Sequence, residues 1–449
     1  MRRRARPRRR LVDGTLPPGS GDAPGKRPRR SRSRRARAGR AALEADYTRL
    51  WLASAVSNAG DGVFVVALPL VAATLTRSPG RVAAVLFAGR LPWLLLALVS
   101  GALVDRWDRR RVMCVVDALR CAGVGTVAAA VATGVATIPL LMASAFLLGV
   151  GETLFDNAAQ SLVAVVVGRD PERLQRANGR LQGSEIVANQ FAGPPAGGFL
   201  FTVGHAVPFL ADAASFAVSS ALIARVRTAP RTPVATEATR RLRTEIGDGL
   251  RWLWRHRLLR TLGLMVGAMN LVFTAGESVL VLFAQDVLGV GPVGFGMLSL
   301  GGAAGGVLAS LLGGRVVRRL GAGPTLLGAA TAIALAQIAV GLVSEAWAVG
   351  ILFGVVGFTT VTWNVLTVSL RQSIVPEHLL GRVNSVYRLL AWGTMPVGAG
   401  VGGLLATWFG LRGPFLVGGA CLLLLPLAAA GVVSSDAVAA AGAVSDPHA

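Results

Sequence analysis

The chain has 449 residues, of which 53% are hydrophobic and only 15% are charged, and this composition excludes a soluble globular protein of that length. The formal net charge of +23 is unevenly placed, because residues 1–40 hold 15 Arg, one Lys and two Asp and account for +14 of it. The long apolar runs are continuous rather than alternating, which excludes a membrane β-barrel. The sequence therefore predicts an all-α membrane protein.

Residues 1–46 combine Arg runs with Pro, Gly and Ser and contain few apolar side chains. A segment of this kind buries no core, so we predict a disordered, Arg-rich cytoplasmic tail. Contact of this tail with anionic lipid or nucleic acid is an alternative interpretation, although we expect no nucleic-acid partner for the protein as a whole. A second disordered cytoplasmic tail is predicted for residues 434–449.

Twelve apolar stretches follow between residues 47 and 433, each roughly as long as the 20 residues that a transmembrane helix requires. They form a predicted N-terminal six-helix bundle at 47–227 and a C-terminal six-helix bundle at 259–433. The polar segment 228–258 is predicted to be a cytoplasmic linker with an amphipathic helix along the membrane surface. Arg is concentrated in every second gap between the stretches, which predicts a multi-pass protein of the cell membrane with both termini in the cytoplasm.

The two halves repeat each other at an offset of about 205 residues. Pro171-Glu172 falls on Pro376-Glu377, and the glycines of the fifth stretch fall on those of the eleventh. Because six helices separate the copies, both halves have the same sense across the membrane and are parallel repeats. The transport path of such a protein lies between the halves.

Acidic residues inside the predicted spans are candidate functional residues, since a carboxylate near the bilayer centre costs about 2.5–3.5 kcal/mol. Asp61 lies near the middle of the first span between two glycines, and Glu277 is its counterpart in the seventh. We expect Arg90 in the second span to neutralise Asp61 when the proton has left. Glu152 and Asp156 share one face of the fourth span, where they line the transport path or the cytoplasmic vestibule.

Asp61 is the first candidate for a proton carrier, because a carboxyl group in a dry crevice readily takes up a proton. Structural capping of a helix kink is the alternative interpretation. Other charged residues stand nearer the predicted span ends and are expected to be anchors at the membrane surface. They are Asp117, Arg120, Glu185 and Asp212.

The loop after the second span carries the segment Gly101-Ala102-Leu103-Val104-Asp105-Arg106-Trp107-Asp108-Arg109-Arg110-Arg111. This segment resembles the G-x-L-x-D-R-x-G-R-R signature of the major facilitator superfamily, with Asp108 in place of the second glycine. A tight turn is expected at that glycine, and Asp also tolerates the left-handed geometry. The resemblance implies a charged cytoplasmic gate, and the alternative is that these arginines only set topology. The predicted gate residues are Gly101, Asp105, Arg106, Arg109 and Arg110.

The fifth span contains Gly193-Pro194-Pro195-Ala196-Gly197-Gly198. This run resembles the G-P-x-x-G-G exporter motif of the same superfamily, whose residues here are Gly193, Pro194, Gly197 and Gly198. Glycines four residues apart let helix backbones approach closely, and proline interrupts the hydrogen-bond ladder.

Further segments resemble the drug and proton antiporter branch of the superfamily, which includes macrolide and siderophore exporters. They lie at 57–62, 68–70, 208–216, 249–253 and 376–385. This resemblance implies the major facilitator fold, with twelve transmembrane helices in two parallel-repeat six-helix bundles. It also implies a protein that works as a monomer.

The resemblance and the charged residues in the spans together predict proton-coupled export of hydrophobic or amphipathic small molecules, of the drug, antibiotic or siderophore type, by alternating access. The expected partners are this cargo, protons and membrane lipid, and the cargo cavity is expected to be lined by Phe64, Phe273, Trp363 and Trp392. With no metal-ligand spacing, phosphate loop or nucleophile constellation, we predict no metal, no cofactor and no catalytic residue, and therefore no enzyme.

Two alternatives remain open from the sequence. One is a lipid or lysolipid flippase of the same fold. A less favoured one is a membrane protein without transport activity whose basic tail binds nucleic acid or lipid.

Overall fold

The structure is a computed structural model that describes residues 29–96, 100, 104, 107–168, 170–227 and 238–433, without the side chains of 29–43, 164 and 238–246. The tail predictions for residues 1–28 and 434–449, and the gate residues Gly101, Asp105 and Arg106, lie outside the described residues. The chain divides into two units, Met1–Leu43 and Glu44–Ala449, and the arrangement given below concerns the second.

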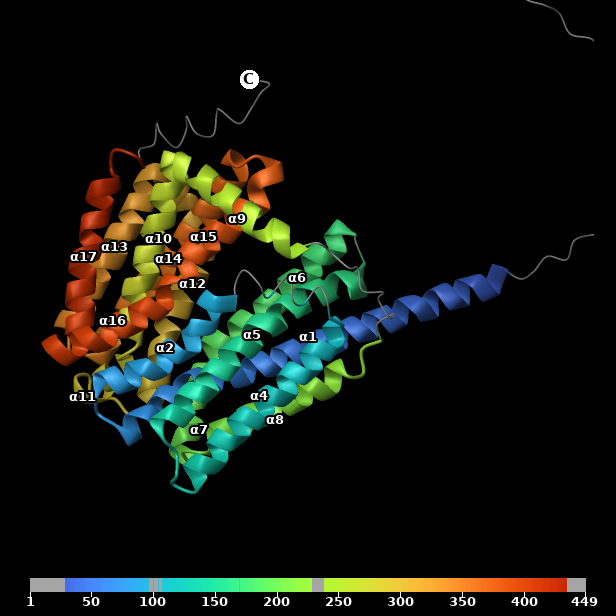
Figure 1. Ribbon diagram of the computed structural model, residues 1–449, viewed down its shortest axis with the longest axis horizontal. Helices are drawn as coiled ribbons and strands as arrows, with labels where there is room; N and C mark the ends of the chain where they lie inside the picture. Colours follow the sequence, from blue (N-terminus) through green and yellow to red (C-terminus); the bar gives the residue numbers. More distant parts are fainter. Residues whose placement is uncertain are drawn as a thin grey trace, which may run out of the picture. The chain divides into compact units, whose positions relative to one another are not determined.

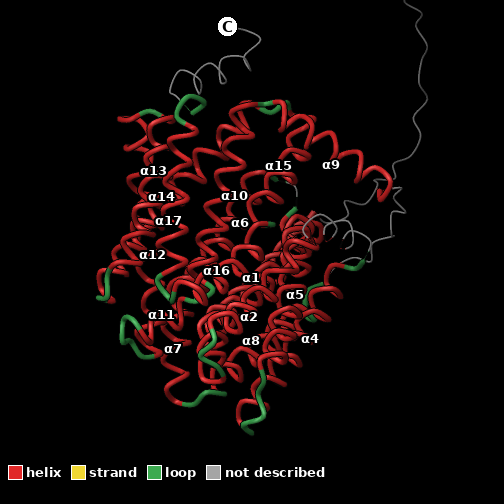
Figure 2. Tube along the Cα trace, turned by 60° about the vertical axis from the view of Figure 1, so that its left-hand side comes forward, coloured by secondary structure: helices red, strands yellow, loops and turns green. Residues whose placement is uncertain are grey.

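Every regular element of the described ranges is a helix, and short loops join the helices (Figures 1 and 2). The first half consists of α1 (Arg29–Leu75), α2 (Pro79–Leu96), α4 (Arg109–Ala132), α5 (Ile138–Val167), α6 (Pro171–Ile186), η1 (Val187–Ala192), α7 (Gly193–Val203) and α8 (Val207–Ile223). The second half consists of α9 (Ala238–Arg255), α10 (Arg257–Glu277), α11 (Leu280–Asp286), α12 (Pro292–Leu320), α13 (Ala322–Leu342), α14 (Ala346–Ile374), α15 (Glu377–Trp392), α16 (Thr394–Phe409) and α17 (Gly413–Ala429). α1 thus begins inside the segment predicted as a tail, and the predicted domain boundaries stay predictions.

The helices agree with the predicted twelve crossings. Nine helical stretches of the described chain are long and apolar enough to span a membrane, and α8 and α17 are shorter apolar helices. The consecutive elements α6, η1 and α7 supply the remaining crossing. A chain with this order of crossings has its two halves in the same sense, as the sequence repeat predicts.

The fifth helix of each half is interrupted at a glycine near a proline. In the first half, η1 is a π-helical turn in which the Gly193 amide donates to the Ala188 carbonyl, directly before Pro194 and Pro195. Proline has no N–H, so a wider turn that reuses the neighbouring amides keeps the backbone paired. In the second half, Gly393 separates α15 from α16.

The apolar core shows how the halves are joined. We call the end of the helices near Leu75 and Asp286 the Leu75 end, and the opposite end the α9 end. Buried apolar side chains of both halves, including Phe64 and Phe415, form one cluster at the Leu75 end. Toward the α9 end the described apolar side chains form separate clusters, around Phe155 in the first half and Leu262 in the second. The halves therefore share a core at one end only.

The segment between the halves includes the helix predicted for the linker. α9 packs against α15, which lies beside it in Figure 1. The Arg382 guanidinium is 3.3 Å from the Asp248 carboxylate, and an added Cβ on Gly249 would lie 2.8 Å from the Arg382 carbonyl oxygen. The described part of α9 is thus braced against the second half.

Glycines set the distance between α12 and α14, which gives a test of the packing. A Cβ added at Gly305 would lie 2.7 Å from the carbonyl carbon of Gly354, whereas one added at Gly328 of α13 meets no atom within 4 Å. Because an overpacked backbone contact costs about 1–3 kcal/mol, Gly305→Val is expected to lower the melting temperature of the detergent-purified protein. Gly328→Val is the control, and equal melting temperatures of the two variants would contradict this packing.

Candidate functional site

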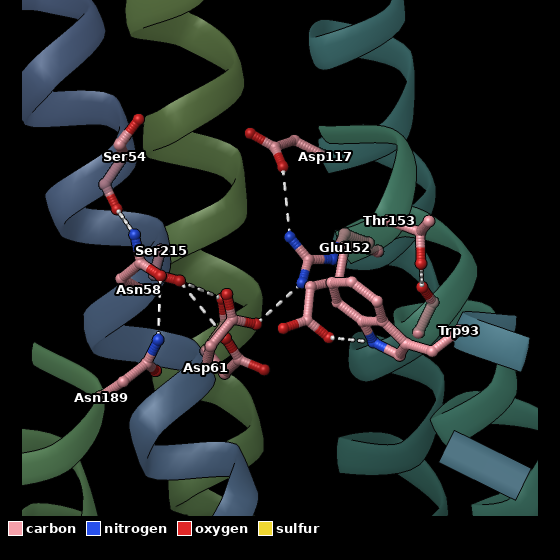
Figure 3. Close-up of polar contacts among 12 residues, drawn as sticks. Ser54, Asn58, Asp61, Trp93, Asp117, Glu152, Thr153, Asn189 and Ser215 are labelled. Carbon is pink, nitrogen blue, oxygen red and sulfur yellow. Dashed lines mark hydrogen bonds and ion pairs between the residues drawn. The ribbon is translucent and has the colours of Figure 1, made fainter. Parts of the chain in front are cut away.

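A buried ion-pair cluster lies within the first half, between α1 and α4 (Figure 3). The Arg120 guanidinium donates to the Asp61 carboxylate at 2.9 Å and is 3.8 Å from the Asp117 carboxylate. The Arg120 side chain is 3% exposed, that of Asp61 is 21% exposed and that of Asp117 is fully buried. The ring of Phe216 lies 4.3 Å from the guanidinium carbon. Asp61 is therefore the one carboxylate of this trio that other molecules can reach.

The prediction that Arg90 neutralises Asp61 is wrong. Arg120 of α4 pairs with Asp61, whereas Arg90 of α2 turns toward the second half and pairs with Glu277. Arg120 lies eleven residues into α4, or roughly 16 Å along its axis, which brings it to the depth of Asp61. The prediction that Arg120, Asp117 and Asp212 are anchors at the membrane surface is also wrong, since all three side chains are buried.

Asp212 approaches the cluster from α8, which packs directly against α4. Its Oδ1 lies 3.4 Å from the Ser215 hydroxyl, which donates to the Asp212 backbone carbonyl at 2.8 Å. A Cβ on Gly60 would lie 2.9 Å from the Ser215 Cβ and closer still to the Asp212 carboxylate. The glycine before Asp61 is therefore required by the close approach of α8.

A small pocket opens beside Asp61, and four of its eight lining residues are acidic. Its volume of about 20 Å³ has room for about one water molecule. The lining residues are Ser57, Asn58, Asp61, Arg120, Glu152, Phe155, Asp156 and Glu185. Glu152 and Asp156 thus share one face of α5 and line the same pocket. Glu185, which we predicted as an anchor, joins them from α6.

Polar side chains on α1 hold the neighbouring interrupted helix. The Asn189 amide of η1 donates to the Asn58 side-chain carbonyl at 2.9 Å, and the Asn58 amide donates to the Ser54 backbone carbonyl at 2.8 Å. This pair was not predicted, although Asn58 stands one turn before Asp61 in the sequence. The π-turn is thereby tied to the helix that carries Asp61.

Glu277 lies at the end of α10, where the two halves meet. Its carboxylate is 3.3 Å from the Arg90 guanidinium, and both side chains are partly exposed. At the Leu75 end, Arg77 donates to Gln285 at 2.6 Å and lies 3.4 Å from Asp286. Two arginines of the first half therefore reach acceptors of the second.

The predicted aromatic lining of a cargo cavity is only partly exposed. Phe273 is 42% exposed and Trp392 is half-buried, but Phe64 and Trp363 lie in the buried apolar clusters. The prediction is therefore wrong for Phe64 and Trp363. Hydrophobicity alone does not distinguish a core aromatic residue from one that lines a path.

Two of the predicted gate arginines lie in the described chain. Arg109 donates to the Ser161 backbone carbonyl at 3.4 Å, and Arg110 donates to the Ala224 carbonyl. Asp108 is extended, with φ −68° and ψ 112°, and its carboxylate accepts from the Arg111 amide at 2.8 Å. It is thus the N-cap of α4 and does not form the left-handed turn expected of a glycine substitute.

The exporter-like motif packs α7 against two helices. An added Cβ on Gly193 would lie 2.7 Å from the Gly62 carbonyl carbon, and one on Gly197 would lie 3.1 Å from the Val63 Cα. On the adjacent face of α7, Gly198 meets α12 at Pro292 and the Pro194 carbonyl meets Gly296. The motif therefore joins α1 to the second half.

Among the side chains that the structure describes, no group of three or more His, Cys, Asp and Glu is arranged to hold a metal ion. The three cysteines are free thiols. The chemistry available at the cluster is that of carboxylates, an arginine and a small polar pocket, which suits the binding and release of protons.

The chain matches one protein family and several related proteins. The family model for transmembrane secretion effectors matches residues 41–446. The multidrug efflux pump Tap of Mycobacterium tuberculosis is 30% identical over 390 residues, which cover 85% of this chain and 91% of the relative. Tap of Mycolicibacterium fortuitum is 29% identical over 395 residues, covering 85% and 93%.

Solved structures share the fold at low sequence identity. A bacterial homologue of the iron transporter ferroportin, in an inward-facing state, matches with a TM-score of 0.68 at 19% identity, covering 87% of this chain and 98% of the other. A point mutant of the nucleoside transporter NupG matches with a TM-score of 0.71 at 11% identity, covering 87% and 100%. At these identities the likeness shows the fold alone.

Removal of the buried guanidinium tests the cluster. Arg120→Met leaves Asp61 and Asp117 without a cation, so it is expected to destabilise the purified protein by about 3–5 kcal/mol. Adding Asp61→Asn and Asp117→Asn to that variant should restore part of the loss, measured as melting temperature in detergent.

Arg77→Met is the matched control, because it breaks an exposed pair worth less than about 1 kcal/mol. Equal destabilisation by the two arginine substitutions would mean that Arg120 does not hold a buried cluster.

Proposed function

Because the chain belongs to the transmembrane secretion effector family of the major facilitator superfamily, and is a multi-pass membrane transporter, we propose that it exports hydrophobic or amphipathic small molecules in exchange for protons. The observation that carries the proposal is the buried Arg120–Asp61 pair, whose carboxylate lines a small polar pocket. Proton coupling needs an acidic group with two stable states inside the protein, and this pair supplies both.

The two states follow from the charges. When Asp61 is ionised, the Arg120 guanidinium neutralises it across the 2.9 Å contact. When Asp61 takes up a proton, Arg120 loses that partner and turns its charge toward Asp117, which lies 3.8 Å away. Proton binding therefore redistributes charge between α1 and α4 within a largely buried region, where electrostatic interactions are strong.

Alternating access is supported by the uneven contact between the halves. The halves share a core at the Leu75 end and have separate cores toward the α9 end. α7 contacts α12 and α2 contacts α16 through glycines, including Gly198 and Gly403. Small residues leave no interlocking side chains, so these surfaces can part as one half rocks against the other.

We infer the class of cargo from the names of the curated relatives. Curated relatives at about 30% identity are named multidrug efflux pumps, which favours drug-like or antibiotic molecules, with secreted siderophores as a further candidate class. We place the protein in the cell membrane as a monomer, with the α9 end and both termini on the cytoplasmic side, because the arginine-rich loops lie at that end.

Asp61→Asn tests the coupling directly. The amide keeps the size of the side chain but cannot exchange a proton, so the variant is expected to lose proton-driven export while its affinity for cargo changes by less than about threefold. Drug accumulation in a pump-deleted host and equilibrium binding to the purified protein are the two measurements. Glu172→Gln, at an exposed surface pair, is the control, and unchanged export by Asp61→Asn would exclude Asp61 as the coupling residue.

The source of energy separates antiport from a lipid flippase. In everted vesicles, drug uptake is expected to stop when nigericin collapses the pH gradient and to recover when an acid interior is imposed. Transport of a fluorescent lysolipid measured in the same vesicles is expected to be absent. Drug transport that continues without a pH gradient, or lysolipid transport at the same rate, would contradict proton-driven drug export.

A further inference from the structure

Trp93 of α2 contacts both the acidic pocket and the other half of the protein. Its indole N–H donates to the Glu152 carboxylate at 3.4 Å, as Figure 3 shows. Its ring meets the Trp392 ring of α15 edge-on, with centroids 4.5 Å apart and planes at 67°. Trp392 in turn lies under the Arg388 guanidinium at 5.2 Å. One side chain therefore bridges a pocket carboxylate of the first half and an aromatic platform of the second.

The neighbouring residues make this bridge specific. Arg90, three residues earlier on α2, pairs with Glu277 of the second half. Between them, Pro92 packs against α5, where a Cβ on Gly149 would lie 3.0 Å from the Pro92 Cγ. This close contact fixes α2 against α5 and so fixes the distance between Trp93 and Glu152. The same stretch of α2 thus carries two contacts to the second half.

Glu152 is surrounded by the charged side chains of the pocket. The charged groups around it are Asp61 of α1, Arg90 of α2, Arg120 of α4, Asp156 of its own helix and Glu185 of α6. The indole of Trp93 is the neutral donor among these partners. A hydrogen bond to an ionised acceptor is roughly twice as strong as one to a neutral acceptor. The strength of the hydrogen bond between the Trp93 indole and Glu152 therefore depends on the carboxylate charge.

We infer that Trp93 is a positioning residue that links the acidic pocket to the contact between the two halves. The hydrogen bond to Glu152 holds the indole in place, so that the ring keeps its edge against Trp392. When that hydrogen bond is lost, the indole is released and the contact with Trp392 weakens. The halves then separate more readily at the level of α2 and α15.

This inference rests on the proposed function only in that transport requires the halves to move. The contact itself can be measured without cargo or a pH gradient. A failure of the transport assays would therefore leave the result for Trp93 unaffected, and a failure of the Trp93 test would leave proton-driven export standing.

The test is a disulfide beside this contact, where α2 meets the junction of α15 and α16. A Cβ on Gly393 would lie 3.0 Å from the Leu94 Cδ1, which suits a disulfide between Leu94→Cys and Gly393→Cys. The natural cysteines Cys114, Cys121 and Cys421 are first replaced by Ala. The rate of disulfide formation in membranes, with copper phenanthroline as oxidant, then measures how often the halves meet.

In this reporter protein, Glu152→Gln is expected to slow disulfide formation about fivefold, because the amide is a weaker acceptor for the indole. With Trp93→Phe, which keeps an aromatic ring but has no donor, Glu152→Gln should change the rate by less than about twofold. An equal effect of Glu152→Gln in both proteins would overturn the inference.

Two further variants keep the test decisive. Trp347→Phe, at an exposed position of α14, is the matched control and should leave the effect of Glu152→Gln unchanged. If Trp93→Phe is not recovered in membranes, Trp392→Leu removes the other side of the contact and should abolish the effect in the same way. An undiminished effect in Trp392→Leu would also overturn the inference.

Discussion

The burial of the Arg120 guanidinium determines which residues the surrounding helices of the first half carry. Arg120 is removed from water, and a buried cation is tolerated only where carboxylates and close packing replace its hydration. Asp61 and Asp117 supply the charge, and Phe216 covers one face of the guanidinium. A Cβ on Gly151 would lie 2.8 Å from the Arg120 Cδ, so α5 must present a glycine at that point. Four helices thus carry residues whose identity depends on this one side chain.

The glycines connect this cluster to the surfaces that join the halves. Gly60 admits Asp212 and Ser215 of α8, whereas Gly62, two residues later, admits the backbone of η1 and α7. α7 then meets α12 of the second half through Gly198. The helix that carries Asp61 therefore lies in direct backbone contact with the helix that contacts the other half. Under the proposed proton exchange, a shift of α1 would reach the interface through backbone contacts, without a flexible side chain in between.

The fold and the positions of the lone carboxylates follow from the sequence, but the partners of those carboxylates do not. Continuous apolar runs fix the number and order of the crossings, and Asp61, Glu152 and Glu277 stand out in them because a charge at that depth is rare. The partner of Asp61 depends on which way each helix is rotated. Arg90 and Arg120 are both at a suitable depth, and only packing turns one toward Asp61 and the other toward Glu277. The same limitation placed Trp363 in a cavity, although it lies in a buried core.

The two halves share close glycine packing, but the fully buried charged side chains of the described residues, Asp117, Arg120 and Asp212 among them, all lie in the first half. α13 and α17 occupy the places in the second half that α4 and α8 occupy in the first, yet neither contains an acidic or basic residue. The glycines of the fifth helix, in contrast, persist as Gly398, Gly402 and Gly403 and still pack closely. Because the buried cluster around Arg120 lies in the first half, contacts between the halves must link it to the second. Arg90 and Trp93 of α2, which reach Glu277 and Trp392, are placed to do this.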